Sequence, residues 1–258
     1  MAMTSLLLYA FLASTISSLG GLVGGMLLLI RESLAKKLAH YLISFAAGVL
    51  LGVTFLDLLP EAAEAFVEPH DALRYVLLGV VVFFLIERFI ASFHSHEPAL
   101  VGDQHAETLA YARPLVIVGD TVHNFIDGVV VAVAFLASVP LGVVTAVSVL
   151  FHELPHEIAD FAILVRSGMP RGRVMAVNIL SALVAPLGTV LAYFYATTVK
   201  SAQPYLLAIA AGNLLYVALA DLVPHLHHES GVKRVVVQLL LFGLGIAVIF
   251  LLPGHAEA

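Results

Sequence analysis

The sequence predicts an all-α, polytopic membrane protein with eight transmembrane helices. Of its 258 residues, 61% are hydrophobic and only 12% are charged, whereas soluble domains are about half apolar and a quarter charged. The apolar residues form continuous runs instead of the alternating pattern of barrel strands. Each run is close to the roughly 20 residues that cross a bilayer as a helix. Because eight such runs occupy about two-thirds of the chain, we expect residues 1–258 to form a single transmembrane domain.

The apolar runs define the expected spans in order. They lie at about 5–30, 39–59, 73–93, 114–137, 141–165, 174–197, 204–223 and 234–252. No basic stretch precedes the first run and no clear cleavage site follows it, so we expect a helix there rather than a removable signal peptide. The longest loop, at about 94–113, separates the third span from the fourth.

The basic residues predict how these spans are oriented. Ten of the 12 Lys and Arg residues flank odd-numbered loops, namely Arg31, Lys36, Lys37, Arg88, Arg113, Arg166, Arg171, Arg173, Lys233 and Arg234. Only Arg74 and Lys200 flank even-numbered loops. Cytoplasmic loops are enriched in basic residues. We therefore expect the odd-numbered loops, including the one at 94–113, to be cytoplasmic and both termini to be extracytoplasmic.

An internal repeat links the second span to the seventh. Residues 47–60 and 211–224 are identical at eight of fourteen positions, including the Asp-Leu-x-Pro runs that begin at Asp57 and Asp221. These spans run in opposite directions in the expected topology, and inverted repeats of this kind are common in secondary transporters. We therefore expect a 3+2+3 arrangement, in which spans 1–3 and 6–8 are related and spans 4 and 5 lie between them.

Ionisable residues are concentrated in spans 4 and 5. They are Asp120, His123, Asn124 and Asp127 in span 4, and His152, Glu153, His156, Glu157 and Asp160 in span 5. Spacings of three and four residues bring such side chains together on one helix face. If each of the five acids faced lipid unpaired, they would together cost over roughly 12 kcal/mol on insertion scales. The two spans must therefore face each other or water.

A bound divalent cation would neutralise this acidic cluster, which has no basic residue nearby. The cluster offers imidazole nitrogens, carboxylate oxygens and one amide, and the chain has no cysteine. Such ligands suit zinc, iron(II), manganese or cobalt. Hydrogen bonding between helices is the alternative role for any single polar residue in a span, but the clustering favours a metal site. The net charge of -6 argues against a nucleic-acid partner.

Two runs in these spans resemble the paired signatures of the ZIP (Zrt/Irt-like) metal transporters. They are His123-Asn124-Phe125-Ile126-Asp127-Gly128 and His152-Glu153-Leu154-Pro155-His156-Glu157. The resemblance implies a homodimeric transporter, not an enzyme, that imports zinc into the cytoplasm and that also accepts iron, manganese, cobalt or cadmium. Its partners would be metal ions and the lipid bilayer. We expect a multi-pass protein of a bacterial or archaeal inner or plasma membrane.

The resemblance also assigns site residues. A primary metal site would use His123, Asp127, His152 and His156. A second site beside it would use Asn124, Asp127 and Glu153, with Glu157 as a further candidate. Some members carry a glutamate at the position of Ala185, so the second site here is either weaker or completed by Glu157.

Other residues are predicted along the metal path. Asp57 and Asp221 would guard the outer and inner mouths, and Asp120 and Asp160 would lie beside the site. Released metal would meet cytoplasmic histidines, which are His94, His96, His105, His225, His227 and His228. The alternatives are a hydrogen bond at a helix end for the two guarding aspartates and no metal role for the loop histidines.

An intramembrane zinc metalloprotease is the alternative function. The run from His152 to His156 satisfies the HExxH pattern, in which two histidines bind zinc and the glutamate activates water. Two features argue against it. Pro155 lies inside the pattern, and protease chemistry of that form does not need the ligands of span 4.

Overall fold

A computed structural model describes residues 3–92, 105–227 and 231–252, with side chains for all of these except 3, 4, 90–92 and 105–112. Every regular element in these ranges is helical, which confirms the predicted all-α class. His94, His96 and His228 lie outside the described residues, and His105 is described by its backbone alone.

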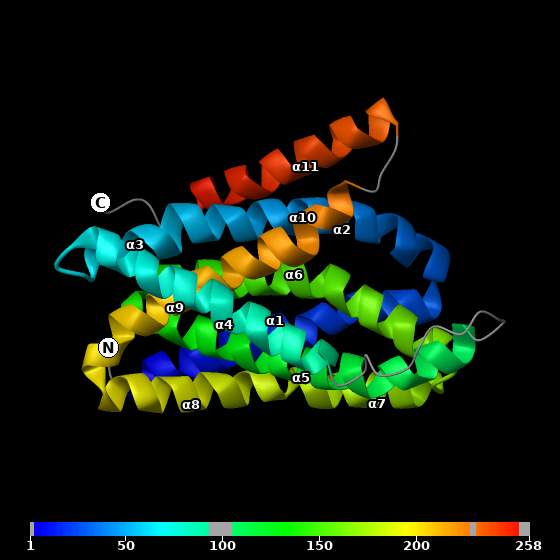
Figure 1. Cartoon of the computed structure of the whole chain (residues 1–258), viewed down its shortest axis with the longest axis horizontal. Coiled ribbons are helices and arrows are strands. Elements are labelled where there is room, and N and C mark those ends of the chain that lie inside the picture. The colour runs from blue at the N-terminus through cyan, green and yellow to red at the C-terminus, as the bar shows by residue number, and fades with distance from the viewer. Residues whose placement is uncertain (1–2, 93–104, 228–230, 253–258) are drawn as a thin grey trace.

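The helices form one elongated bundle (Figure 1). They are α1 (Met3–Ile30), α2 (Glu32–Val53), α3 (Leu59–Glu64), α4 (Ala72–Ser92), α5 (His105–Ala137), α6 (Val139–Arg166), α7 (Arg171–Ala182), α8 (Val184–Thr198), α9 (Gln203–Tyr216), α10 (Val223–Leu226) and α11 (Val232–Leu251). Two π-helical turns, η1 (Thr54–Leu58) and η4 (Val217–Leu222), and two short 3-10 turns, η2 (Pro69–Asp71) and η3 (Lys200–Ala202), connect some of them.

Seven helical segments of the described chain are long and apolar enough to cross a membrane. They are 5–30, 32–64, 113–137, 139–166, 171–198, 200–226 and 232–251. Helix α4, which corresponds to the predicted span at 73–93, carries Arg74, Glu87 and Arg88 and is not in this set. The multi-pass character is confirmed, whereas the count of eight spans stays a prediction.

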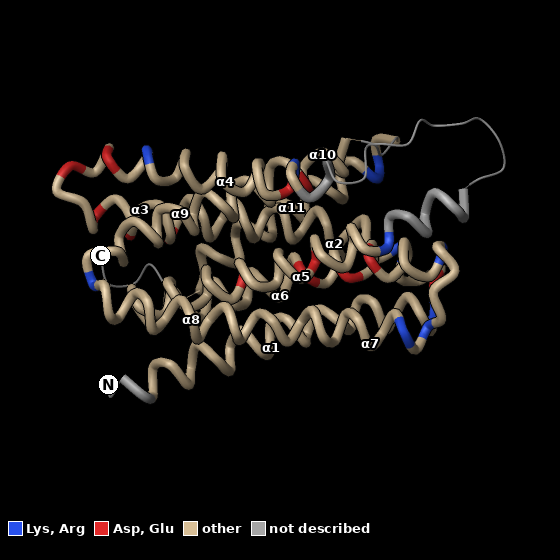
Figure 2. The backbone as a smooth tube through the Cα atoms, turned by 60° about the horizontal axis from the view of Figure 1, so that its bottom comes forward, with Lys and Arg blue, Asp and Glu red and all other residues tan. Residues whose placement is uncertain are grey.

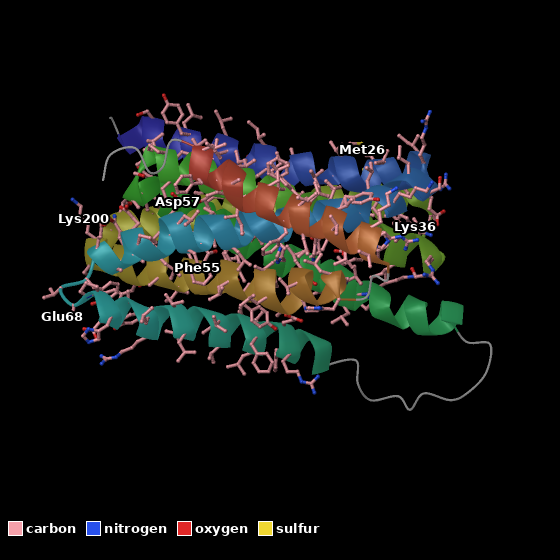
Figure 3. All side chains as sticks on the ribbon, turned by 90° about the horizontal axis from the view of Figure 1, so that it is seen from above. Met26, Lys36, Phe55, Asp57, Glu68 and Lys200 are labelled. Atoms are coloured by element: carbon pink, nitrogen blue, oxygen red, sulfur yellow. The ribbon has the colours of Figure 1, made fainter. Side chains whose placement is uncertain are left out.

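The two ends of the bundle differ in charge. Most lysines and arginines gather at one end, which we call the basic end (Figure 2). Lys36 lies there, whereas Glu68 and Lys200 lie at the opposite, acidic end (Figure 3). The first turn of α1 and the last turn of α11 both lie toward the acidic end (Figure 1). This separation is the one that the loop pattern predicts, and the orientation in the membrane stays a prediction.

The two copies of the repeat share an unusual local structure. Each contains a π-helical turn, η1 or η4, that ends two residues before a proline, Pro60 or Pro224. A proline has no N–H and clashes with the carbonyl four residues earlier, so regular α-helical bonding cannot continue through either site. Helix α3 contacts α9 and α10 contacts α2, so the copies lie antiparallel. This agrees with inversion of the repeat, although the full 3+2+3 relation stays a prediction.

Helices α5 and α6 lie inside the bundle and position the ionisable residues. They pack on each other, and α1, α2 and α8 cover them. Large apolar side chains are exposed mainly on the outer helices, as in Leu77, Leu191 and Leu240. Such a surface suits lipid, so the polar groups of α5 and α6 face protein.

Candidate metal centre

Four side chains of α5 and α6 converge on one point. They are His123, Asp127, His152 and Glu153, and each offers a ligand atom within 4.8 Å of the others. His123 is 9% exposed and the other three are no more than 2% exposed. His123 and Asp127 are four residues apart, which puts them on one face of α5, and that face meets α6. We call this set the four-residue group.

The distances within the four-residue group fit a four-coordinate ion. The Nε2 atoms of His123 and His152 are 3.1 Å apart. Asp127 Oδ2 lies 3.0 Å from His152 Nε2 and 3.7 Å from His123 Nε2. Glu153 Oε1 lies 3.3 Å from His123 Nε2 and 3.6 Å from His152 Nε2. In tetrahedral zinc with bonds of about 2.0–2.1 Å, the ligand atoms are roughly 3.3 Å apart. One zinc-sized ion therefore fits among these atoms with little rearrangement.

Surrounding groups leave the ligand atoms available. His152 Nδ1 lies 3.3 Å from the carbonyl of Ser148, and donation to that carbonyl leaves Nε2 with its lone pair toward the group. Within the described chain, the carboxylate oxygens of Asp127 and Glu153 receive no hydrogen bond, and the groups that face them are the imidazole nitrogens of His123 and His152. Beside neutral imidazoles the two buried carboxylates keep an uncompensated negative charge, which destabilises a fold by several kcal/mol. A bound cation would remove that penalty.

His156 lies beside the four-residue group rather than in it. It groups with Asp120 and Asp160, whose ligand atoms also lie within 4.8 Å of one another. Its Nδ1 is 3.8 Å from Asp160 Oδ2, and its ring stacks on that of His123 with centroids 4.7 Å apart. The structure therefore brings the predicted residues together as two adjoining groups, with Glu153 in the position that the sequence prediction gave to His156.

Asn124 is held by hydrogen bonds and lies in neither group. Its Oδ1 accepts a hydrogen bond from Ser18 of α1, and its Nδ2 donates to Asp120 Oδ1 at 2.8 Å. Ser18 was not predicted as a site residue, although a serine within an apolar span was an available signal. Glu157 is wholly buried, and within the described chain its carboxylate oxygens have no hydrogen-bond partner.

Helix α1 packs against the four-residue group at Gly21. A Cβ at this position would lie 2.6 Å from Glu153 Cβ, closer than real Cβ contacts come. Small residues allow membrane helices to approach closely. The backbone of α1 therefore packs directly against Glu153 and restricts its position.

A cavity of about 310 Å³ borders both groups. Its lining includes His123, His156, Asp160 and Asp221, together with Glu87 of α4, which was not predicted as a site residue. Glu87 of α4 and His156 and Asp160 of α6 lie in the halves of their helices toward the basic end, and His123 lies near the middle of α5. Asp57 is 7% exposed and does not line this cavity. The two repeat-related aspartates thus have different environments.

His225 and His227 are exposed near Asp221, whose carbonyl lies 2.6 Å from His225 Nδ1.

The geometry does not support the metalloprotease alternative. That chemistry needs both histidines of the HExxH pattern on one zinc and the glutamate free to activate water. Here His152 and His156 belong to different groups, and Glu153 itself provides one of the four ligand atoms.

Comparison with known proteins assigns the family. The model for the ZIP zinc transporter family matches residues 4–113 and 101–253. The chain belongs to this family. The ZIP resemblance seen in the signatures of α5 and α6 is thereby confirmed.

Three ZIP relatives show the extent of the similarity. Zinc transporter ZIP13 of Pongo abelii is 31% identical over 224 residues, which cover 81% of this chain and 65% of that protein. Zinc transporter YKE4 of Saccharomyces cerevisiae is 28% identical over 255 residues, with coverages of 87% and 73%. Human zinc transporter ZIP10 is 38% identical over 141 residues, with coverages of 54% and 17%. The chain thus spans less than two-thirds of ZIP13 and ZIP10.

The relatives also correct one prediction. They are eukaryotic proteins, which contradicts the assignment of a bacterial or archaeal membrane. Apolar spans and basic loops identify a membrane protein, but they carry no information about the kind of cell. The multi-pass membrane character of this ZIP protein is unaffected.

Proposed function

We propose that this protein carries Zn²⁺ across a membrane into the cytoplasm and binds it in transit between α5 and α6. The observation that supports this proposal most directly is the four-residue group, in which the imidazole nitrogens lie 3.0 to 3.7 Å from the carboxylate oxygens inside the bundle. Nitrogen and oxygen ligands suit borderline divalent metals. Iron, manganese, cobalt and cadmium are therefore further candidate cargoes.

The proposed route runs from the acidic end to the basic end. Glu61, Glu64 and Glu68 concentrate cations at the acidic end by charge attraction. The ion then binds to the four-residue group and passes to Asp120, His156 and Asp160, which adjoin the cavity. It leaves past Asp221 toward the exposed His225 and His227. The two adjoining groups support this order of binding, because each provides imidazole and carboxylate ligands for the same ion.

Alternating access would come from movement around α5 and α6. Inverted repeats provide two related arrangements around a midplane site, and π-helical turns frequently occur at functional sites. The turns η1 and η4 lie in the two repeat copies and place Asp57 and Asp221 near opposite ends. We propose that these turns are where spans 2 and 7 adjust when access changes.

Metal uptake into proteoliposomes tests the proposal. Vesicles that contain a metal-sensitive dye would be given zinc, iron(II), manganese, cobalt or cadmium, with wild type compared to His123→Ala. The control is His70→Ala, which removes an imidazole that is 68% exposed at the acidic end. We expect zinc uptake to fall at least about tenfold in His123→Ala, as for the loss of a metal-site contact, and to be unchanged in the control.

Two outcomes would contradict this function. If His123→Ala took up zinc as fast as wild type, the four-residue group would not lie on the transport route. An absence of flux for every metal from correctly inserted protein would favour a metal sensor that binds without transport. Homodimer formation also stays a prediction, and the mass of the detergent-solubilised protein tests it.

A further inference from the structure

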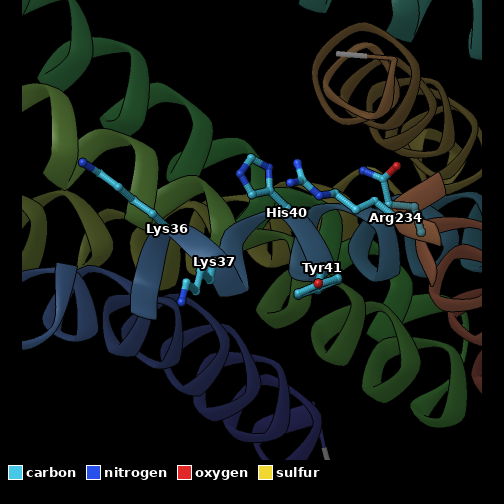
Figure 4. Close-up of a pocket in the computed structure, with 6 residues that line it drawn as sticks. Lys36, Lys37, His40, Tyr41 and Arg234 are labelled. Atoms are coloured by element: carbon cyan, nitrogen blue, oxygen red, sulfur yellow. The ribbon is translucent and has the colours of Figure 1, made fainter. Parts of the chain in front are cut away.

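A second cavity lies away from the metal centre, between the N-terminal halves of α2 and α11. Its volume is about 400 Å³, and it is lined by Lys36, Lys37, His40, Tyr41, Arg234 and Gln238. In Figure 4, the Arg234 side chain extends from α11 toward His40 on α2. None of these described lining residues is acidic. We call this space the α2–α11 cavity.

The packing of α2 against α11 explains why this cavity exists. The two helices approach closely at Gly48 and Gly245, where an added Cβ would collide with the backbone of Phe242 and Phe45, respectively. From this contact, α11 diverges from α2 toward the basic end (Figure 1). The divergence leaves a space between two helix ends that both carry basic residues.

The charge of the α2–α11 cavity is opposite to that of the protein as a whole. The chain has a net charge of -6, yet this space gathers Lys36, Lys37 and Arg234 and adds the amide of Gln238 and the hydroxyl of Tyr41. Gln238 is only 6% exposed, so the amide forms part of the cavity floor. Glu32, which pairs with Lys36, does not line the cavity. The lining is therefore rich in donors that suit a phosphate.

The surface beside the cavity is apolar. Leu38 of α2 and Val235 of α11 are each 37% exposed. They lie three residues before Tyr41 and Gln238, respectively, which puts each of them on the helix face next to a lining residue. A ligand that fills this space would thus have its anionic part among the basic residues and an apolar part along the two helices. A phospholipid has this structure, because its phosphate is joined to apolar acyl chains.

We propose that the α2–α11 cavity binds the phosphate of an anionic phospholipid from the leaflet at the basic end. Basic pockets between transmembrane helices bind such headgroups, and each Lys or Arg near the membrane surface contributes about 1 kcal/mol, or roughly fivefold in affinity. Arg234 gives the phosphate a planar, multidentate donor, and the two lysines add charge. The lipid would bridge α2 and α11 where the protein itself does not fill the gap.

Lipid binding to the full-length protein in detergent tests this proposal. Native mass spectrometry would compare phosphatidylglycerol with phosphatidylcholine for wild type and for K36Q/K37Q/R234Q. The matched control is R166Q/R171Q/R173Q, which removes three exposed charges at the same end but outside the cavity. We expect wild type to prefer phosphatidylglycerol. The cavity variant should lose about 100-fold in affinity if the roughly fivefold contributions of three cations combine, and the control should change little.

Three results would overturn the proposal. They are equal binding of both lipids by wild type, an equal loss in the control variant, and complete displacement of phosphatidylglycerol by millimolar inorganic phosphate, which would indicate a free-anion site. If the triple variant fails to fold, as judged by its elution profile, the lipid affinities of the single variants Lys37→Gln and Arg234→Gln test the proposal instead. Each should lose about fivefold in affinity for phosphatidylglycerol, and Arg234→Lys, which keeps the charge without the planar donor, should lose less than Arg234→Gln.

Discussion

His152 Nε2 lies 3.0 Å from Asp127 Oδ2, so an imidazole of α6 faces a carboxylate of α5 inside the bundle. The same nitrogen lies 3.1 Å from His123 Nε2. Two imidazole nitrogens and a carboxylate that converge in this way need a shared proton or a cation between them. The relationship makes His152 the residue whose loss should affect the four-residue group most directly.

We expect His152→Ala to weaken zinc binding at least about 100-fold, because it removes a direct ligand, whereas loss of an outer-shell contact typically costs 10–100-fold. Titration calorimetry on the detergent-solubilised protein measures this, with His70→Ala as the control. His156→Ala should have a smaller effect on the tightest site, because His156 lies in the adjoining group. A different result would favour the primary site predicted from the sequence over the four-residue group. In that case His156→Ala would reduce zinc affinity as much as His152→Ala does, and Glu153→Gln would leave zinc affinity unchanged.

Glu153→Gln separates a carrier from a protease. A carrier should show weaker zinc binding and slower uptake in this variant, because Glu153 Oε1 is one of the four ligand atoms. A protease should keep its zinc tightly bound and lose only cleavage. Uptake, bound zinc and cleavage of a transmembrane test substrate would be measured on the same preparations. Cleavage by wild type that disappears in Glu153→Gln would refute the carrier assignment.

Gly21→Ala should disturb the metal centre from the neighbouring helix. The new Cβ would meet Glu153 Cβ at 2.6 Å, so α1 or Glu153 must move. Overpacking of this kind typically costs about 1–3 kcal/mol, and we expect a lower melting temperature together with weaker zinc binding. Circular dichroism and calorimetry measure the two effects. The control is Gly243→Ala in α11, where a Cβ meets nothing within 4 Å, and a helical Ala there stabilises by up to about 1 kcal/mol relative to Gly. Equal behaviour of the two variants would show that α1 does not restrict Glu153.

The sequence predicted the bundle well because each span has a strong local signal. Continuous apolar runs and basic loops indicate helices and their ends, and all eight predicted runs coincide with helical segments. The predicted span at 174–197 is divided at Leu183 into α7 and α8. Pro186 explains the break, because a proline removes the bond to the carbonyl four residues earlier, here that of Ala182, the last residue of α7. Pro60 and Pro224 likewise mark the positions of the π-helical turns, but a proline alone does not predict which kind of irregular turn forms.

The candidate site was predictable as a cluster but not as a geometry. Helical spacing placed His152 and His156 on one face, and this is correct, yet one turn of α6 separates them enough to put them in different groups. Which residues of α5 each one meets depends on how the helices are shifted along each other, and a single sequence does not contain that information. Ser18 was missed for the same reason, because its contact with Asn124 joins residues 106 positions apart.

The unequal environments of Asp221 and Asp57 predict unequal access from water. Asp221 lines the cavity that borders the metal centre, whereas Asp57 is 7% exposed and lies outside that cavity. The chain has no cysteine, so Asp221→Cys and Asp57→Cys each introduce a single thiol into an otherwise unchanged protein. Since thiol reactivity follows exposure of the sulfur, a membrane-impermeant reagent should modify Asp221→Cys at least about tenfold faster than Asp57→Cys when applied from the basic end. Zinc should slow modification of Asp221→Cys if the ion passes through the cavity. Equal rates, or a faster reaction of Asp57→Cys from that end, would show that the cavity is not the inner mouth of the route.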